Sequence, residues 1–217
     1  MADTPDLGSG ALRRGGSSPL IRTILTAMNI QIYFSDKFTK FNKSKLSKKD
    51  KKLYKIRGNS ADFLLSRSIK SRIKKKGKFS ISHKKFDSNL LNLAPNFANS
   101  QNYHIAAVGI GNKKLGLDLE VLADRNHEAV INFCFNEFEK NLMQICNKNE
   151  KKILFYQIYT IKEAIIKLEN LAFSDLARVG LCQDNSTIKA KNHKGKFIIF
   201  KTYLLYNKFL ISVCFKG

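Results

Sequence analysis

The chain has 217 residues, 43% of them hydrophobic, which is typical of a globular protein with one domain or two tightly packed halves. No apolar run approaches the roughly 20 residues of a membrane-spanning helix, so we expect a soluble protein. Its four cysteines are widely spaced without metal-ligand spacing and predict free thiols in a reducing compartment, so we expect it to be cytoplasmic. The net charge of +22 is compatible with nucleic acid, an anionic membrane surface, a polyanionic small molecule or an acidic protein as partner.

The N-terminal region changes character near Met28. All basic side chains before this residue are arginines, in a segment with glycine, serine and little periodicity. We expect residues 1–27 to be a flexible leader or a segment of artificial origin, with Met28 as the native start. Alternating apolar and polar residues from Ile30 to Phe34 then predict a strand, and the lysine-rich stretch from Ser44 to Lys55 predicts a solvated helix and loop.

The next part of the chain combines a helix, a strand and a polar segment. Apolar residues at a spacing of four predict a helix over about residues 60–73, with Arg67 away from its buried face. Residues 79–83 predict a short strand. Residues 84–102 are rich in asparagine and serine and predict a long loop or surface insertion.

The remainder of the chain alternates strands with helices. Tyr103–Ile110 and Lys114–Val121 read as strands, and Gly111-Asn112 between them is a turn signal that predicts a hairpin. Helical periodicity follows from Asn126 to Leu171. Two further strands are expected, at Phe197–Leu205 and Phe209–Phe215.

The order of these elements indicates the α+β class. Because strand, helix and strand precede a second set of strands, helix and strands, we expect two similar halves. The N-terminal half is placed at residues 28–111 and the C-terminal half at residues 112–217.

Two acids alternate with leucine in the stretch from Leu115 to Glu120. On a strand, side chains two residues apart point to the same face, so Asp118 and Glu120 lie together while Leu117 and Leu119 enter the core. Carboxylates about 6 to 7 Å apart along a strand can share a hard divalent cation. The alternative is an ordinary amphipathic edge strand whose acids face water.

A second charged pair lies within the predicted helical region. Glu163 and Lys167 are four residues apart, so on a helix they share one face. A surface ion pair, which contributes about 0.3 to 0.5 kcal/mol, explains this spacing equally well. His83 ends a predicted strand, where a lone histidine is more often structural than catalytic.

Taken together and in order, these blocks resemble the phosphopantetheinyl transferase superfamily, particularly its larger, monomeric, surfactin-synthetase-activating type. Phe79–His83 resembles the family's strand ending in Ser-His, and Gly116–Glu120 is similar to its Gly-Ile-Asp-Ile-Glu. Phe155–Lys167 is similar to its Trp-Thr-x-Lys-Glu-Ala-x-x-Lys, with Tyr159 in the place of tryptophan. A further stretch resembles the family's Phe-Phe-Ser...Glu through Phe133, Phe135 and Glu137.

The resemblance implies an enzyme, a phosphopantetheinyl transferase of the holo-[acyl-carrier-protein] synthase type. It would move the phosphopantetheine arm of coenzyme A onto a serine of an apo acyl or peptidyl carrier protein, as in fatty acid biosynthesis, releasing 3′,5′-ADP. The implied fold is a pseudo-dimer of two packed α/β halves with the active site in the cleft between them. Magnesium, or manganese, would be the metal.

The resemblance also implies roles for individual residues. The metal ligands would be Asp118, Glu120 and Glu163. Glu163 and Lys167 would be catalytic, with Glu163 accepting the serine proton and Lys167 holding the phosphates. Coenzyme contacts would come from Arg57, Arg67, Lys78, Ser82, His83, Lys162 and Lys167. The expected partners are coenzyme A and the carrier protein, with no nucleic acid and no membrane.

The high positive charge leaves one alternative function open. The chain would then be a basic protein that binds nucleic acid or an anionic surface without catalysis. Lysine runs at residues 48–52 and 74–76 favour this alternative. They lack the interleaved aromatic residues of a single-strand binding platform, and the sequence has no helix-turn-helix or zinc-finger signature.

Overall fold

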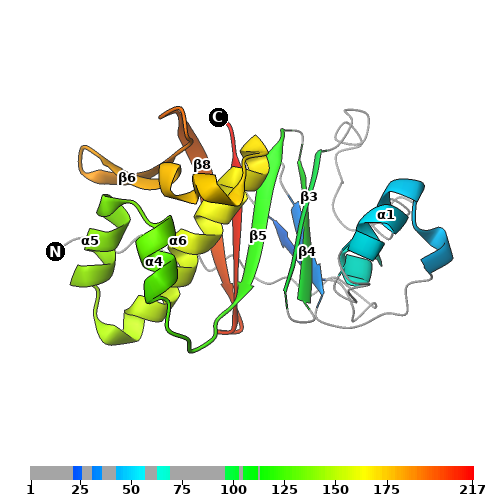
Figure 1. Ribbon diagram of the computed structural model, residues 1–217, viewed down its shortest axis with the longest axis horizontal. Coiled ribbons are helices and arrows are strands. Elements are labelled where there is room, and N and C mark those ends of the chain that lie inside the picture. The colour runs from blue at the N-terminus through cyan, green and yellow to red at the C-terminus, as the bar shows by residue number, and fades with distance from the viewer. Residues whose placement is uncertain are drawn as a thin grey trace. The chain divides into compact units, whose positions relative to one another are not determined.

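The structure, a computed structural model, describes residues 22–25, 31–35, 43–56, 63–68, 96–102, 105–111 and 113–217. The described residues fall into two compact units, within Leu12–Lys113 and Lys114–Gly217. Both units contain helices and antiparallel strands, which confirms the predicted α+β class (Figure 1). The part of the chain that the structure describes has no helix long and apolar enough to cross a bilayer.

The first unit contains a four-stranded antiparallel sheet with the order β1-β2-β4-β3. Its strands are β1 (Arg22–Leu25), β2 (Gln31–Ser35), β3 (Asn96–Asn102) and β4 (Ile105–Gly111). β2 and β4 confirm two strands expected from alternating apolar residues. β1 lies within the first 27 residues, where no element was predicted, and it pairs with β2 over its whole length.

Two predictions on the strands were wrong. Residues 96–102, expected to belong to a loop, form β3 and pair with β4 from end to end. Asparagine, serine and glutamine are poor strand formers, so pairing with an apolar strand overrides local propensity here. The hairpin at Gly111-Asn112 does not form, because β4 belongs to this sheet whereas β5 (Leu115–Val121) pairs with β9 (Phe209–Phe215) in the other.

The helical parts of the first unit were expected from the sequence. The lysine-rich stretch forms η1 (Lys43–Lys45) and α1 (Lys48–Ile56), and residues 63–68 are helical. Phe63 is buried against Leu46 and Tyr54, and this small cluster joins the two helical segments. The predicted continuation of the second helix beyond residue 68, the strand at 79–83 and the segment 84–95 lie outside the described residues.

The second unit contains a five-stranded antiparallel sheet with the order β5-β9-β8-β7-β6. β8 (Phe197–Leu205) and β9 confirm the two predicted C-terminal strands. β6 (Gly180–Asp184) and β7 (Thr187–Lys191) were not predicted. Their two-residue turn begins at Asn185, whose positive φ of 54° suits a tight hairpin. Asparagine adopts positive φ more readily than most residues, so Asn185 was the missed sequence signal.

The predicted helical region from Asn126 to Leu171 forms three helices. These are α4 (Glu128–Cys134), α5 (Glu137–Ile145) and α6 (Lys148–Glu169), followed by η2 (Phe173–Arg178). α6 runs along the sheet and packs against β5 and β9, as Figure 1 shows. The longest helix therefore lies beside the strand that carries the predicted metal ligands.

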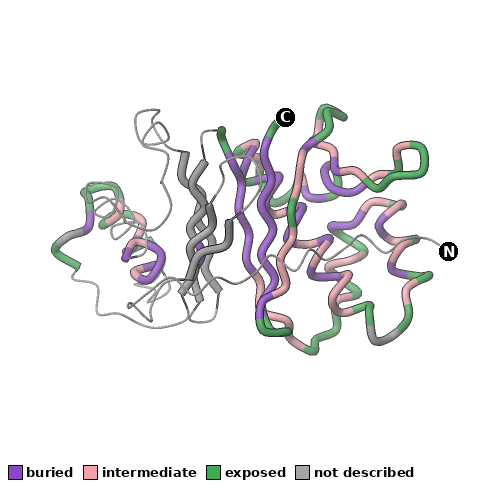
Figure 2. The backbone as a smooth tube through the Cα atoms, turned by 180° about the vertical axis from the view of Figure 1, so that it is seen from behind, coloured by how far each residue is buried: buried purple, intermediate pink, exposed green. Residues whose placement is uncertain are grey.

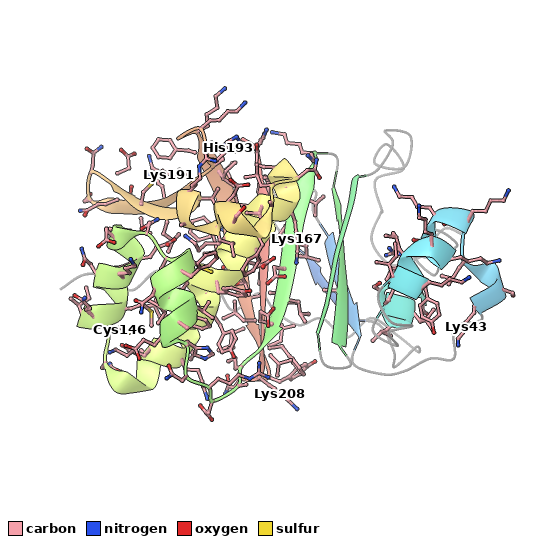
Figure 3. All side chains as sticks on the ribbon, viewed as in Figure 1. Lys43, Cys146, Lys167, Lys191, His193 and Lys208 are labelled. Atoms are coloured by element: carbon pink, nitrogen blue, oxygen red, sulfur yellow. The ribbon has the colours of Figure 1, made fainter. Side chains whose placement is uncertain are left out.

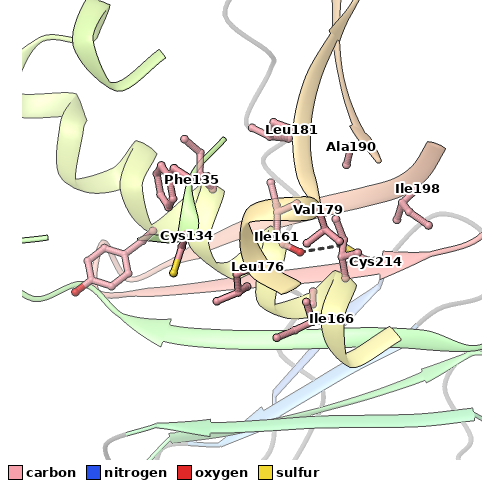
Figure 4. Packing of buried hydrophobic residues seen from close by; sticks show 14 of the residues in the cluster. Cys134, Phe135, Ile161, Ile166, Leu176, Val179, Leu181, Ala190, Ile198 and Cys214 are labelled. Carbon is pink, nitrogen blue, oxygen red and sulfur yellow. Dashed lines mark hydrogen bonds between the residues drawn. The ribbon is translucent and has the colours of Figure 1, made fainter. Parts of the chain in front are cut away.

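The core of the second unit lies between α6 and the sheet. Ile161 and Ile165 of α6 are buried together with Leu210 and Cys214 of β9 (Figure 4). The Sγ of Cys214 donates to the carbonyl of Ile161 at 3.7 Å. Every residue of β9 is buried, as the tube of Figure 2 shows, so this strand is the centre of the sheet's packing.

Candidate active site

Gly116 determines how closely α6 approaches β5. A Cβ atom at this position would lie 1.8 Å from the backbone oxygen of Ala164 and 2.8 Å from the backbone nitrogen of Leu168. Only glycine leaves room for this contact. Because alternate strand residues share a face, Asp118 and Glu120 lie on the same side of β5 as Gly116, the side that meets α6.

Lys167 of α6 joins the two predicted motifs at one point, and Figure 3 labels it where α6 runs beside β5. Its Nζ donates to Oδ1 of Asp118 at 2.5 Å and lies 3.6 Å from Oε2 of Glu163. The side chain of Lys167 is 38% exposed, whereas that of Asp118 is 3% exposed. The ammonium group therefore sits over a buried carboxylate while it stays open to solvent.

The burial of Asp118 argues against the interpretation of β5 as an amphipathic strand whose acids face water. A carboxylate of a simple amphipathic strand would face water, whereas Asp118 is paired and almost fully enclosed. Leu117 and Leu119 have no exposed surface, so the prediction that they enter the core is confirmed. The ion pair of Glu163 and Lys167 is likewise part of a three-residue network and not an isolated surface pair.

Neighbouring charges shape the acid–base properties of this network. Burial and the nearby charge of Asp118 raise the pKa of Glu163, against the opposing effect of Lys167. Burial lowers the pKa of Lys167, but attraction to Asp118 and Glu163 outweighs it and leaves that pKa raised. Glu120 adds to the same attraction, so Lys167 stays charged. The raised pKa of Glu163 makes its carboxylate a better proton acceptor.

Lys162, one residue before Glu163, points into the protein interior. It has no exposed surface, and its Nζ donates to Oε2 of Glu139 and to the carbonyl of Val179, both at 2.5 Å. Burial raises the pKa of Glu139 and lowers that of Lys162, while the pairing opposes both shifts. This placement favours a structural role for Lys162 over the predicted contact with coenzyme A.

Glu139 is a residue that the sequence analysis missed. Asn136 caps α5 by accepting from the backbone N–H of Glu139, and the Glu139 carboxylate accepts in return from the backbone N–H of Asn136. The same carboxylate also accepts from the backbone N–H of Leu181. The signal was the spacing Asn-x-x-Glu of a capping box. Glu137, which the resemblance had singled out, is instead exposed and pairs with Lys140.

Gly180 makes room for the buried pair. Its φ of 123° is a conformation that residues with a side chain rarely adopt, and a Cβ there would lie 2.2 Å from Oε1 of Glu139. The glycine at position 180 therefore allows both the positive φ and the pairing of Glu139 with Lys162 beside it. The result is a fixed connection between α5, α6 and β6.

Among the remaining predicted coenzyme contacts, Arg67 is the one that the described residues include. Arg67 belongs to the first unit, where its Nε donates to Oδ1 of Asp50 at 2.7 Å and its guanidinium lies 4.3 Å from the ring centre of Phe63. Arg57, Lys78, Ser82 and His83 lie outside the described residues. The structure thus brings together Asp118, Glu163 and Lys167.

Magnesium fits the carboxylates that meet at Lys167. Among the described residues, no three His, Cys, Asp or Glu side chains are arranged so that they could hold a metal ion. However, magnesium in phosphate-processing sites needs only one or two carboxylates beside substrate phosphates and water. Asp118 and Glu163 provide two, and both approach one cationic nitrogen, so this place accommodates positive charge. Glu120 stays a predicted ligand.

Comparison with known proteins bears on the second unit. Residues 114–214 match the family model of the 4′-phosphopantetheinyl transferase superfamily. No match was found among curated proteins. The matched range includes Asp118, Glu163 and Lys167, so the resemblance inferred from their motifs is confirmed at the level of the superfamily for this part of the chain.

Proposed function

We propose that this protein transfers the 4′-phosphopantetheine arm of coenzyme A to a serine of an apo carrier protein and releases 3′,5′-ADP. The observation that carries the proposal is the meeting of Asp118 and Glu163 at the ammonium group of Lys167. These residues come from two sequence motifs that lie far apart in the chain. The superfamily match spans both motifs and supports phosphopantetheine transfer in general.

The reaction requires a proton acceptor and a set of positive charges. The serine Oγ forms a bond to the β-phosphorus of coenzyme A, the bond from that phosphorus to the 3′,5′-ADP oxygen breaks, and the serine proton must be removed. Glu163 is suited to accept this proton, because burial makes its carboxylate more basic. When bound, magnesium would neutralise charge on the pyrophosphate.

Lys167 and Asp118 have complementary roles in this proposal. The ammonium group of Lys167 has three N–H donors, one of which bonds to Asp118, and its side chain is exposed enough for the group to approach phosphate oxygens as well. Asp118 is buried beneath it and keeps the lysine side chain directed to one place. Charge stabilisation by preorganised groups of this kind is usually the largest contribution to phosphoryl transfer.

The finer features of the proposal concern type and partner. We propose the larger, monomeric, surfactin-synthetase-activating type, a pseudo-dimer of two α/β halves with the coenzyme bound between them. Arg57, Arg67, Lys78, Ser82 and His83 of the N-terminal half stay predicted contacts of the coenzyme. The carrier protein is expected to be acidic, because the net charge of +22 would favour its approach.

Mass spectrometry of an apo carrier protein tests the proposal. After incubation with the protein, coenzyme A and magnesium, the carrier should gain about 340 Da, the mass of the transferred arm. Asp118→Asn and chelation by EDTA should each abolish the gain, whereas Lys201→Ala, at an exposed position on β8, should retain it. No gain with several carriers, together with salt-sensitive nucleic-acid binding, would refute the proposal and support the alternative function.

A further inference from the structure

Four side chains form a continuous row along one face of α6. Phe155, Tyr159, Glu163 and Lys167 follow one another at a spacing of four residues, so each lies one turn from the next. The rings of Phe155 and Tyr159 stack at 5.8 Å with an interplanar angle of 11°. The Tyr159 hydroxyl donates to Oε1 of Glu163 at 3.3 Å, and Oε2 of Glu163 lies 3.6 Å from Nζ of Lys167.

Packing holds the Tyr159 end of this row in place. Phe155 is buried, and besides Tyr159 it stacks on Phe135 at 5.5 Å and on His127 at 3.8 Å, both nearly parallel. A ring that packs against such a stack has little freedom to turn. Packing of its ring therefore restricts where the Tyr159 hydroxyl can lie.

The two oxygens of Glu163 thus have different neighbours. Oε1 accepts from the phenol, whereas Oε2 is directed toward Lys167, which in turn is bonded to Asp118. At neutral pH a phenol is protonated and can donate, since its usual pKa is about 10. A hydroxyl–carboxylate bond usually measures about 2.5 to 3.0 Å, so this bond is long, as catalytic hydrogen bonds often are before substrate binds.

We infer that Tyr159 is a positioning residue, whose hydroxyl holds one oxygen of Glu163 so that the other faces the place where Asp118 and Lys167 meet. The inference rests on the proposed function, because it takes Glu163 as a metal ligand and proton acceptor. Tryptophan, which the resemblance leads one to expect here, has no hydroxyl group. The hydroxyl contact therefore depends on the tyrosine at this position and goes beyond the packing that any aromatic ring supplies.

Binding of Mn²⁺ measured by electron paramagnetic resonance tests the inference without relying on turnover. The full-length protein is titrated in the presence of coenzyme A, with binding to the coenzyme alone subtracted. Tyr159→Phe removes only the hydroxyl, and we expect Mn²⁺ affinity to fall about 10- to 100-fold, as is typical when a partner that orients a metal ligand is lost. Tyr156→Phe is the matched control, since its hydroxyl bonds to the backbone of Ala123 instead.

The outcomes separate the inference from the proposed function. Mn²⁺ binding by the wild-type protein that is unchanged in Tyr159→Phe would overturn the inference and leave the proposed function intact. Absence of Mn²⁺ binding by the wild-type protein would overturn the metal site and, with it, the inference. Equal weakening by Tyr156→Phe would mean that any lost hydroxyl disturbs α6, and would overturn the inference as well.

A double variant provides a second test, which does not depend on how much Tyr159→Phe alone weakens Mn²⁺ binding. If Tyr159 acts through Glu163, adding Tyr159→Phe to Glu163→Ala should weaken Mn²⁺ binding no further. An additional loss in that background would contradict the inference. Thermal unfolding of each variant confirms that the titrated protein is folded.

Discussion

The close contact at Gly116 predicts that one added methyl group will disturb both stability and activity. In Gly116→Ala, the new Cβ would lie 1.8 Å from the backbone oxygen of Ala164, whereas real Cβ contacts essentially never fall below 3.0 Å. The helix and the strand must therefore separate by about 1.2 Å, from 1.8 to 3.0 Å, and backbone on both sides makes the shift costly. We expect a loss of about 1 to 3 kcal/mol in the free energy of unfolding.

The same shift would act on the site, because Gly116 and Asp118 lie on one strand face and Lys167 lies on the displaced helix. A misplacement of about 1 Å commonly costs about 100-fold in rate. Urea unfolding would measure the stability, and carrier mass spectrometry would measure the rate at a temperature where the variant is folded. Gly217→Ala, whose new Cβ makes only an ordinary contact at 3.5 Å, is the matched control. Wild-type stability and rate in Gly116→Ala would refute the reasoning.

Two further predictions concern groups outside the proposed chemistry. Lys162→Met should lower the free energy of unfolding by about 3 to 5 kcal/mol in urea unfolding, because it leaves Glu139 buried without its cation. Adding Glu139→Gln should recover part of this loss, because the amide removes the buried charge while its oxygen can still accept from the backbone N–H of Leu181. An equal or larger loss in the double variant would contradict this account. Burial lowers the pKa of His127 below its ordinary value of 6.5, so the unfolded chain binds the proton more tightly and stability should be lost as pH falls through about 6.5. The advantage of the wild type over His127→Gln in thermal unfolding should therefore shrink between about pH 8 and pH 5, and a constant difference would exclude this role.

The sequence predicted best where a buried face imposes a clear period. β5 and α6 were expected because leucine alternates with acids in one and apolar residues recur every turn in the other. These are also the elements that carry Asp118, Glu163 and Lys167. The positions of the candidate site residues could therefore be predicted from these patterns, whereas their chemical roles came from the family resemblance and stay predictions.

The failures have a common physical cause, since they concern partners distant in the sequence. β3 forms because β4 is there to pair with it, and the turn at Gly111-Asn112 gives no information on which sheet each strand will join. Lys162 and Lys167 are the same residue type on one helix, so the sequence does not show which of them is buried. Lys162 lies in the interior because α6 packs against α5 and β6 there. Tyr159 and Glu163 lie one turn apart on the predicted helix, but that spacing alone does not show that the phenol donates to the carboxylate.

The buried pair of Glu139 and Lys162 has a consequence for how α6 can vary. Successive residues on a helix are rotated by about 100°, so the lysine that enters the core fixes the direction in which Glu163 points. Inserting or deleting one residue within α6 before Lys162 would turn the second half of the helix and present the wrong side chain to β5. The connection between α5 and α6, at Cys146 and Asn147, lies outside this constraint. An insertion between these two residues should therefore be tolerated better than one within α6, which would rotate Glu163 away from β5.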